Sequence, residues 1–295
     1  YHLAKKSLKK GWRVTSISSN LPKKVRYLSK VKYIVCDVTN KNTLKKKIKG
    51  TFDYIVNLAG YVDHSQKKKT YRSHYLGCKN LTSIFIKKKP EAFVQIGSCI
   101  EYGNLKSPQK ENYKFKPSLV KSIYGKAKLL SSMHLLDLFK KKKFPVTILR
   151  LYLAYGPKQD ANRFLPIIIN GCINNKKFPC SKGNQLRDFI HVNDVVRAII
   201  KSLPNKNAKG KIINIGSGKP KKIINIIKQI KKITKGGHPE YGKIKFRKDE
   251  ILELYPAINN AKKILNWEPK TSFNLGLAKT IKYYKTIKEN EFQFN

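Results

Sequence analysis

Short apolar runs that end at small or polar residues alternate with amphipathic stretches along the first half of this 295-residue chain. Apolar runs occur at Val14–Ser18, Val31–Val35, Phe52–Gly60 and Ala92–Ser98, and helical patterns at Tyr75–Lys87 and Ala127–Lys140. Strands that alternate with helices form a parallel sheet whose two faces the helices cover. The sequence therefore predicts an α/β fold with a doubly wound parallel sheet.

Polar and small residues follow the predicted strands at positions where ligands bind in such folds. Asp37 follows the second run, Gly60 closes the third and Ser98 closes the fourth. Ligands of open α/β sheets bind outside the carboxyl ends of the strands. We therefore expect these residues and the helix that carries Tyr124 to meet at one rim of the sheet.

Tyr124 and Lys128 stand four residues apart, soon after the run that ends in Gly97-Ser98. On a helix, such positions share one face, so the phenol and the ammonium can reach the same pocket. A phenol with a pKa of about 10 is a poor acid or base near neutral pH, but a nearby cation favours the phenolate. Ser98 would hold a substrate oxygen beside Tyr124. This spacing also arises by chance in a lysine-rich chain, so its context decides its meaning.

Seven motifs follow one another in the order of a known family. They are Asp37-Val38, Asn57-Leu58-Ala59-Gly60, Ser98 with Glu101-Tyr102-Gly103, Tyr124 with Lys128, Leu149-Arg150 with Tyr155-Gly156-Pro157, Arg187-Asp188-Phe189 with His191 and Asp194, and Asn214-Ile215-Gly216-Ser217-Gly218. The chain resembles the extended short-chain dehydrogenase/reductases, and within them the NAD(P)-dependent sugar-nucleotide epimerase/dehydratase family. The resemblance implies a Rossmann-type doubly wound sheet with a smaller C-terminal α/β substrate domain.

The resemblance also implies a domain division. Residues 1–155 are expected to form the NAD(P)-binding Rossmann domain, and residues 156–295 mainly the substrate-binding domain, with about 186–215 returning to the Rossmann core. The family's Gly-rich dinucleotide loop has no counterpart, because the sequence opens with residues that resemble those just after its last glycine. We therefore expect a fragment whose first strand and Gly-rich loop are missing.

Catalytic and cofactor roles follow from the resemblance. It implies that Tyr124 exchanges a proton with the sugar C4 oxygen, that Lys128 lowers the pKa of Tyr124 and binds the nicotinamide ribose, and that Ser98 orients the same oxygen. It places Asp37 and Val38 beside the adenine of the cofactor. The segment Leu58-Ala59-Gly60 is expected to line the cofactor channel.

The end of the predicted strand Val14–Ser18 bears on the choice between NAD and NADP. An acidic residue there would bind the ribose hydroxyls of NAD, whereas its absence near basic residues favours the 2′-phosphate of NADP. The position holds Ser18, and Lys23 follows in the next turn. We therefore prefer NADP over NAD as the cofactor, with a solvated turn as the alternative interpretation of Lys23.

Substrate recognition is expected from the C-terminal part. Arg187 matches the family's phosphate-binding arginine, and a guanidinium suits a diphosphate. The preceding loop, with Ser181 and Gln185, resembles the segment that packs against the nucleotide base, and Arg163 is a second arginine candidate for the same pocket. Asp194 is expected to cap the helix that follows it. His74 departs from the family pattern, because it stands where Asn is usual, and it is either a proton-relay residue or a packing residue.

Residues that some members of the family carry and this chain lacks narrow the range of reactions that the resemblance implies. Ser98 is followed by Cys99-Ile100, whereas the 4,6-dehydratases of the family carry an Asp-Glu pair there as acid and base. Glu101 is one position away and is interpreted as a carboxylate paired with Lys or Arg. The resemblance then implies 4-ketoreduction or 4-epimerisation of a nucleotide-diphosphate hexose or deoxyhexose. The open alternatives are an NAD-dependent 4-epimerase proper and a non-catalytic RNA- or nucleotide-binding member of the fold.

The formal net charge of +47 would attract polyanions. The lysines are spread over many predicted helix ends and loops, however, so we predict no specific nucleic-acid partner. No apolar run approaches the length of a membrane span, so no membrane insertion is expected. The five cysteines lack paired or metal-ligand spacing, which predicts no metal site and a reducing, cytoplasmic location. Assembly as a homodimer is left open.

Overall fold

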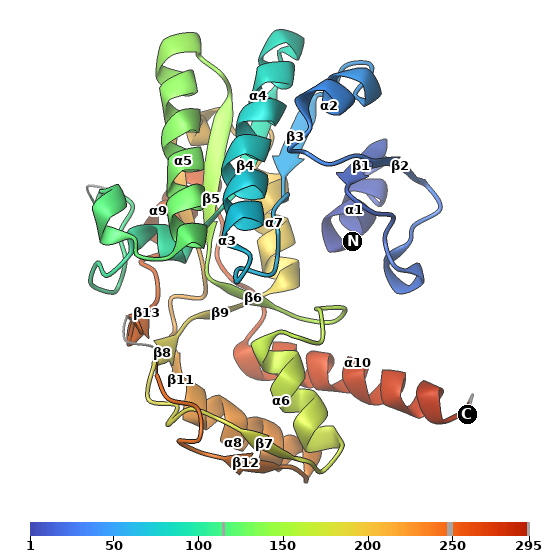
Figure 1. Cartoon of the computed structure of the whole chain (residues 1–295), viewed down its shortest axis with the longest axis vertical. Helices are drawn as coiled ribbons and strands as arrows, with labels where there is room; N and C mark the ends of the chain where they lie inside the picture. Colours follow the sequence, from blue (N-terminus) through green and yellow to red (C-terminus); the bar gives the residue numbers. More distant parts are fainter. Residues whose placement is uncertain (114–115, 247–249, 294–295) are drawn as a thin grey trace.

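The computed structural model describes residues 1–113, 116–246 and 250–293. A larger unit of strands and helices lies above a smaller unit, as Figure 1 shows. The larger unit contains α1 (His2–Leu8), β1 (Val14–Ser18), η1 (Lys24–Arg26), β2 (Val31–Val35), α2 (Lys41–Lys47), β3 (Tyr54–Asn57), α3 (Lys67–Tyr71), η2 (Arg72–Leu76), α4 (Gly77–Lys88), β4 (Ala92–Ser98), η3 (Cys99–Tyr102), η4 (Pro117–Leu119), α5 (Ile123–Lys142), β5 (Val146–Leu151), α7 (Val192–Ser202), η5 (Lys206–Ala208), β10 (Ile212–Ile215) and α9 (Asn259–Leu265).

The strands of the larger unit are parallel. Four of them form a sheet in the order β10-β5-β4-β3, and β1 and β2 form a separate two-stranded sheet. All four strands predicted from the sequence are present, although β3 is shorter than the apolar run that predicts it. The predicted α/β class with a parallel sheet is confirmed. Among the described residues, no strand joins the two sheets.

Alternating side chains of β4 pack into two different cores. Val94 and Ile96 belong to a cluster with residues of α7 and α9, whereas Phe93 belongs to a cluster with residues of α4 and α5. Successive side chains of a strand point to opposite faces, so an apolar run without polar gaps fits a strand covered on both sides. All seven residues of β4 are buried. The helices thus enclose the sheet from both faces.

Helix α5 begins earlier than its amphipathic pattern predicts. The Ser122 side chain accepts a hydrogen bond from the N–H of Gly125, which caps the helix at its start. The helix then runs unbroken from Ile123 to Lys142. Tyr124 and Lys128 therefore lie on one helix, one turn apart, as the sequence predicts.

The smaller unit is built from short strands and three helices in the described part of the chain. Its elements are β6 (Leu153–Tyr155), α6 (Phe164–Ile173), β7 (Lys177–Pro179), β8 (Leu186–Arg187), β9 (Phe189–His191), β11 (Lys221–Lys222), α8 (Ile223–Thr234), β12 (His238–Glu240), β13 (Glu253–Leu254) and α10 (Phe273–Gln293). One apolar cluster joins α6, α8 and α10, with Ile169, Ile230 and Leu277 fully buried in it. This cluster fixes α6, whose first turn faces the larger unit.

Asp194 does not cap α7, so that prediction is wrong. The helix begins at Val192, and the side chain of His191 caps it by accepting from the N–H of Asn193. The Asp194 carboxylate instead accepts hydrogen bonds from the N–H groups of Lys270 and Thr271. An acidic side chain in a first turn is available for long-range contacts as well as for capping, and the sequence pattern does not distinguish the two.

No helix among residues 1–113, 116–246 and 250–293 combines the length and the apolar character that crossing a membrane requires.

Candidate active site

The end of β4 carries the first site residue. Ser98 is the last residue of the strand, and its side chain accepts a hydrogen bond from the N–H of Ile100 as η3 begins. Glu101 completes a capping box, since its carboxylate accepts from the N–H of Ser98 at 2.8 Å. Both hydrogen bonds fix the direction in which the chain leaves the sheet. Ser98 is thereby held at the carboxyl edge predicted for it.

Tyr124 lies in the first turn of α5 and is in contact with Ser98. Burial raises the pKa of Tyr124 to about 12, and a hydrogen bond from Ser98 and the charge of Arg163 act in the opposite direction. At neutral pH the phenol therefore holds its proton. A buried phenol of this kind is set up to donate a proton to a bound oxygen, and a cation is needed before it can accept one.

Lys128 lies one turn further along α5 and is almost fully buried. Its Nζ donates a hydrogen bond to the carbonyl oxygen of Ile96 at 2.7 Å. Burial lowers the pKa of Lys128, while the charge of Glu101 raises it. Arg163 is a further cation whose charge lowers the pKa of Tyr124.

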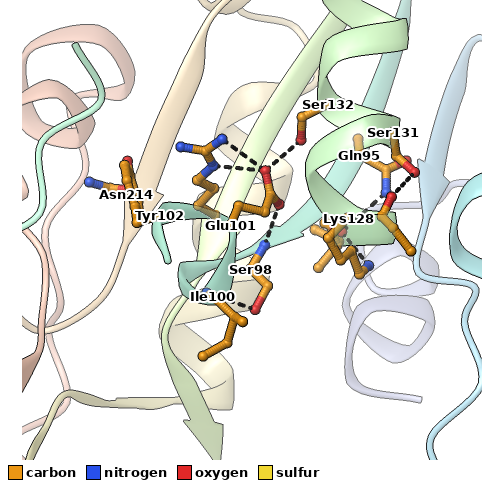
Figure 2. A network of polar contacts seen from close by, with 12 residues as sticks. Gln95, Ser98, Ile100, Glu101, Tyr102, Lys128, Ser131, Ser132 and Asn214 are labelled. Carbon is orange, nitrogen blue, oxygen red and sulfur yellow. Dashed lines mark hydrogen bonds and ion pairs between the residues drawn. The ribbon is translucent and has the colours of Figure 1, made fainter. Parts of the chain in front are cut away.

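A buried network joins the end of β4 to β5 and α5, and Figure 2 shows its members. The Glu101 carboxylate forms an ion pair with the guanidinium of Arg150, with 2.9 Å between Oε2 and Nη2, and both side chains are fully buried. Ser132 of α5 donates to the same carboxylate at 2.7 Å. The guanidinium of Arg150 also lies 4.4 Å from the centre of the Tyr102 ring. Glu101 is thus a paired carboxylate, as the sequence predicts, but it is a central one and not a surface group.

The residues expected to hold the cofactor lie along the neighbouring strand ends. Asp37 is exposed after β2, and its carboxylate accepts from the N–H of Thr39. Val38 packs close to Gly77, where an added Cβ would lie 2.7 Å from its methyl group. After β3, Leu58 is 58% exposed. Asp37 and Leu58 are therefore both accessible to solvent at the ends of their strands.

Gly60 lies against an imidazole ring. An added Cβ at Gly60 would lie 1.8 Å from Cε1 of His74. Between Leu58 and Gly60, the N–H of Ala59 donates to the Asn57 side chain at 3.1 Å, which holds the turn after β3. The segment 58–60 is therefore a tight strand exit with little side-chain bulk, as a cofactor channel requires.

Ser18 and Lys23, the two residues expected to distinguish NADP from NAD, lie in different surroundings. Ser18 ends β1, and its hydroxyl donates to the carbonyl oxygen of Asn20. Lys23 is exposed and lines a cavity of about 560 Å³ together with Arg26, Lys158 and Tyr283. The position after β1 thus carries no carboxylate, while several cations lie in the loop beyond it.

The four expected substrate residues belong to the smaller unit, and the charges of two of them, Arg163 and Arg187, act on groups of the site. Arg163 immediately precedes α6, and its charge acts on Tyr124. Arg187 of β8 is paired with Glu250, and its charge acts on Cys99, next to Ser98. The Gln185 side chain donates to Ser181 at 3.3 Å, and its buried carbonyl oxygen has no partner among the described residues.

Two histidines contact Tyr124: His64, to which the sequence analysis assigned no role, and His74, which it left as either a proton-relay or a packing residue. The His64 ring stacks on the Tyr124 ring, with 4.0 Å between the ring centres. The His74 ring packs edge-on against the Tyr124 ring, with 5.0 Å between the ring centres. His64 lies in the loop after β3, and no periodicity or spacing links that loop to α5. The contact arises from tertiary packing. The described residues contain no group of three or more His, Cys, Asp or Glu side chains that could hold a metal ion.

Ser98, Tyr124 and Lys128 thus lie together at the carboxyl edge of a parallel sheet. The family model described as "NAD dependent epimerase/dehydratase family" matches residues 1–216. This protein belongs to that family. The recognition made from the seven motifs is confirmed.

Among similar proteins, human dTDP-D-glucose 4,6-dehydratase is 27% identical over 224 residues, which are 73% of this chain and 62% of that protein. UDP-glucuronate 4-epimerase of Thermodesulfobacterium geofontis (strain OPF15) is 33% identical over 143 residues, 48% of this chain and 43% of that protein. The chain thus spans less than two thirds of either relative. A structure of UDP-glucuronic acid 4-epimerase from Bacillus cereus, in complex with UDP-glucuronic acid and NAD, superposes with a TM-score of 0.84 at 22% identity, covering 97% of this chain and 95% of that one.

Glu101→Gln is expected to destabilise the fold by about 3 kcal/mol, because it removes the carboxylate from a fully buried ion pair. The free energy of unfolding from urea denaturation measures the effect. Asp137→Asn serves as the control, since it breaks the exposed pair with Lys141 on the same helix and should cost about 0.5 kcal/mol or less. Equal losses in the two variants would contradict the central role of Glu101.

Proposed function

We propose that the protein is an NAD(P)-dependent oxidoreductase that acts at C4 of a nucleotide-diphosphate sugar, by 4-ketoreduction or 4-epimerisation. The observation that carries the proposal is the placement of Ser98 at the carboxyl end of β4 and of Tyr124 in the first turn of α5, the helix that packs against β4 and η3. Lys128 is buried one turn away on the same helix. A binding protein that only kept the fold would have no need for this proton-transfer group.

In the proposed mechanism, a bound nicotinamide supplies or accepts the hydride. Tyr124 gives its phenol proton to the C4 oxygen when that carbon is reduced, and takes a proton from it when the carbon is oxidised. Ser98 holds the same oxygen by a hydrogen bond. The cations Lys128 and Arg163 stabilise the phenolate that remains after the proton has left.

Water elimination is disfavoured by the residues after Ser98. A dehydration needs one group that protonates the leaving hydroxyl and another that removes a proton from carbon. Burial raises the pKa of Cys99 to about 12, and Ile100 cannot exchange protons. Glu101 accepts hydrogen bonds from Ser98, Ser132 and Arg150 within the network of Figure 2, so it is engaged elsewhere. Redox chemistry at C4 needs none of these groups.

The proposal divides the chain by role. Residues 1–155 would bind the cofactor, and 156–295 mainly the sugar nucleotide, with about 186–215 contributing to the Rossmann core. The parallel pairing of β10 with β5 supports the return of the chain to the sheet. Arg187 and Arg163 would bind the diphosphate, and Ser181 and Gln185 would contact the base, where the buried carbonyl oxygen of Gln185 is available as an acceptor.

Two assays with the purified protein test the reaction type: a panel of nucleotide-diphosphate 4-keto-6-deoxyhexoses with NADPH, and a panel of nucleotide-diphosphate hexoses with NAD. Stoichiometric loss of reduced-nicotinamide absorbance together with a reduced sugar supports ketoreduction. Isomerised nucleotide hexose without net cofactor consumption supports the epimerase proper. If the protein produces neither and still binds a sugar nucleotide, the oxidoreductase proposal fails and a binding role replaces it.

Tyr124→Phe is expected to lower kcat at least about 100-fold, because it removes only the hydroxyl that exchanges the proton. The dissociation constant of the cofactor should stay within about twofold, since the ring remains. Steady-state kinetics and a cofactor titration by fluorescence measure the two quantities. A variant that keeps most of its turnover would show that another group transfers the proton.

The cofactor preference is tested at the end of β1. NADP is our proposal over NAD, because Ser18 offers no carboxylate to the ribose hydroxyls and Lys23 follows in the next turn. We expect the protein to bind NADPH more tightly than NADH and Ser18→Asp to reverse that order by charge repulsion. The dissociation constants of both cofactors for both proteins provide the measurement. Tighter binding of NADH by the unchanged protein would reject the NADP assignment.

A further inference from the structure

Three aromatic rings from separate segments meet at the proposed proton-transfer residue. His64, from the loop after β3, lies nearly parallel to the Tyr124 ring, with 14° between the planes and 4.0 Å between the ring centres. His74 lies at 72° to the Tyr124 ring and 5.0 Å from its centre. The two imidazoles are themselves 6.1 Å apart. A tyrosine contacted in this way has little room to turn.

His74 is held in place from three directions. It lies in η2, a π-helical turn between α3 and α4, which is a rare irregularity that is often found at functional sites. Its Nε2 is 3.2 Å from the carbonyl oxygen of Tyr61. Its Cε1 edge lies so close to Gly60 that a Cβ there would come within 1.8 Å. Because a carbonyl oxygen only accepts, Nε2 carries the proton and Nδ1 has a lone pair.

The position of His74 has an energetic cost. Its Nδ1 is buried and has no hydrogen-bond partner among the described residues, and such a group typically costs about 1 to 3 kcal/mol. A buried polar atom without a partner calls for an explanation in a native fold. A leucine or methionine would fill similar space without this cost. The imidazole is therefore kept for something other than stability.

The charge state of His74 is compatible with a tyrosine that must hold a proton. Burial, together with the charges of Lys128 of α5 and of His64, lowers the pKa of His74 to about 3, against the opposing effect of the hydrogen bond with the Tyr61 carbonyl oxygen. The ring is therefore neutral at physiological pH. It adds steric restraint beside Tyr124 without adding a second positive charge to the pocket.

We propose that His74, together with His64, is a positioning residue that holds the ring of Tyr124 with its hydroxyl at Ser98. The inference rests on the proposed role of Tyr124 as the acid and base of the reaction. His74 acts through Tyr124 and does not itself exchange a proton with substrate. Gly60 contributes to the same positioning of Tyr124, because only a residue without a side chain leaves room for the His74 imidazole.

His74→Asn tests the proposal, with His134→Asn as the matched control. His134 lies on the same helix as Tyr124 and contacts Thr82 of α4, away from the phenol. We expect kcat of His74→Asn to fall about 10-fold to 100-fold, because a misplaced reacting group costs about that much, with KM changed less than about twofold. The control should keep kcat within about twofold.

Gly60→Ala provides an independent route to the same effect, since its methyl group would push the imidazole away. The double variant with His74→Asn should lose no more kcat than the worse single variant, because both changes remove one restraint. If His74→Asn does not fold, His74→Gln takes its place, because its longer amide can still donate to the Tyr61 carbonyl oxygen. Fully additive losses in the double variant would contradict a shared restraint.

A spectroscopic measurement separates this inference from the proposed function. In protein with ¹³C-labelled tyrosine, the Tyr124 ring signals are assigned by their loss in Tyr124→Phe. We expect slow ring rotation in the unchanged protein and in His134→Asn, and averaged signals in His74→Asn. If the Tyr124 signals are the same in all three, His74 does not position the ring, and the inference is overturned. This result needs no turnover, so it stands even if Tyr124→Phe proves to be active.

Discussion

A fully buried ion pair between Glu101 and Arg150 holds together the three elements that build the site. Glu101 belongs to η3 directly after β4, Arg150 lies on β5, and Ser132 of α5 donates to the same carboxylate. The other carboxylate oxygen caps the N–H of Ser98. Desolvated charges cost several kcal/mol unless their partners satisfy them, so these four groups must fold together. The position of Ser98 relative to α5 follows from that requirement.

The electrostatics of the site come from both units of the fold. The larger unit buries the Tyr124 phenol, which raises its pKa and keeps it protonated. The smaller unit contributes the opposing charge of Arg163, at the start of α6. Helix α6 is fixed by an apolar cluster that, in the part of the chain that the structure describes, includes no residue of the β10-β5-β4-β3 sheet. A ligand bound between the units would therefore act on the same charges that govern the phenol.

Sequence patterns predicted the main elements and the placement of Tyr124 and Lys128 on one helix, but not the surroundings of these two side chains. The runs at Val14–Ser18, Val31–Val35 and Ala92–Ser98 are strands in the structure, since a short apolar run bounded by polar or small residues is typical of a strand in a covered parallel sheet. The direction of the Lys128 ammonium could not be predicted, because the competing carbonyl oxygen of Ile96 belongs to a strand 32 residues away. The wrong prediction for Asp194 has the same cause, since the N–H groups that donate to its carboxylate lie in a distant C-terminal segment.

The sequence by itself determined the α/β class, the family, and the presence of Ser98, Tyr124 and Lys128 at one edge of the sheet. These depend on periodicity, on motif order and on the turn of a helix, which are local properties of the chain. Only the tertiary structure decided that His64 and His74 surround the phenol. Those contacts join a loop, a π-helical turn and a helix, and packing in three dimensions brings together side chains that no local pattern relates.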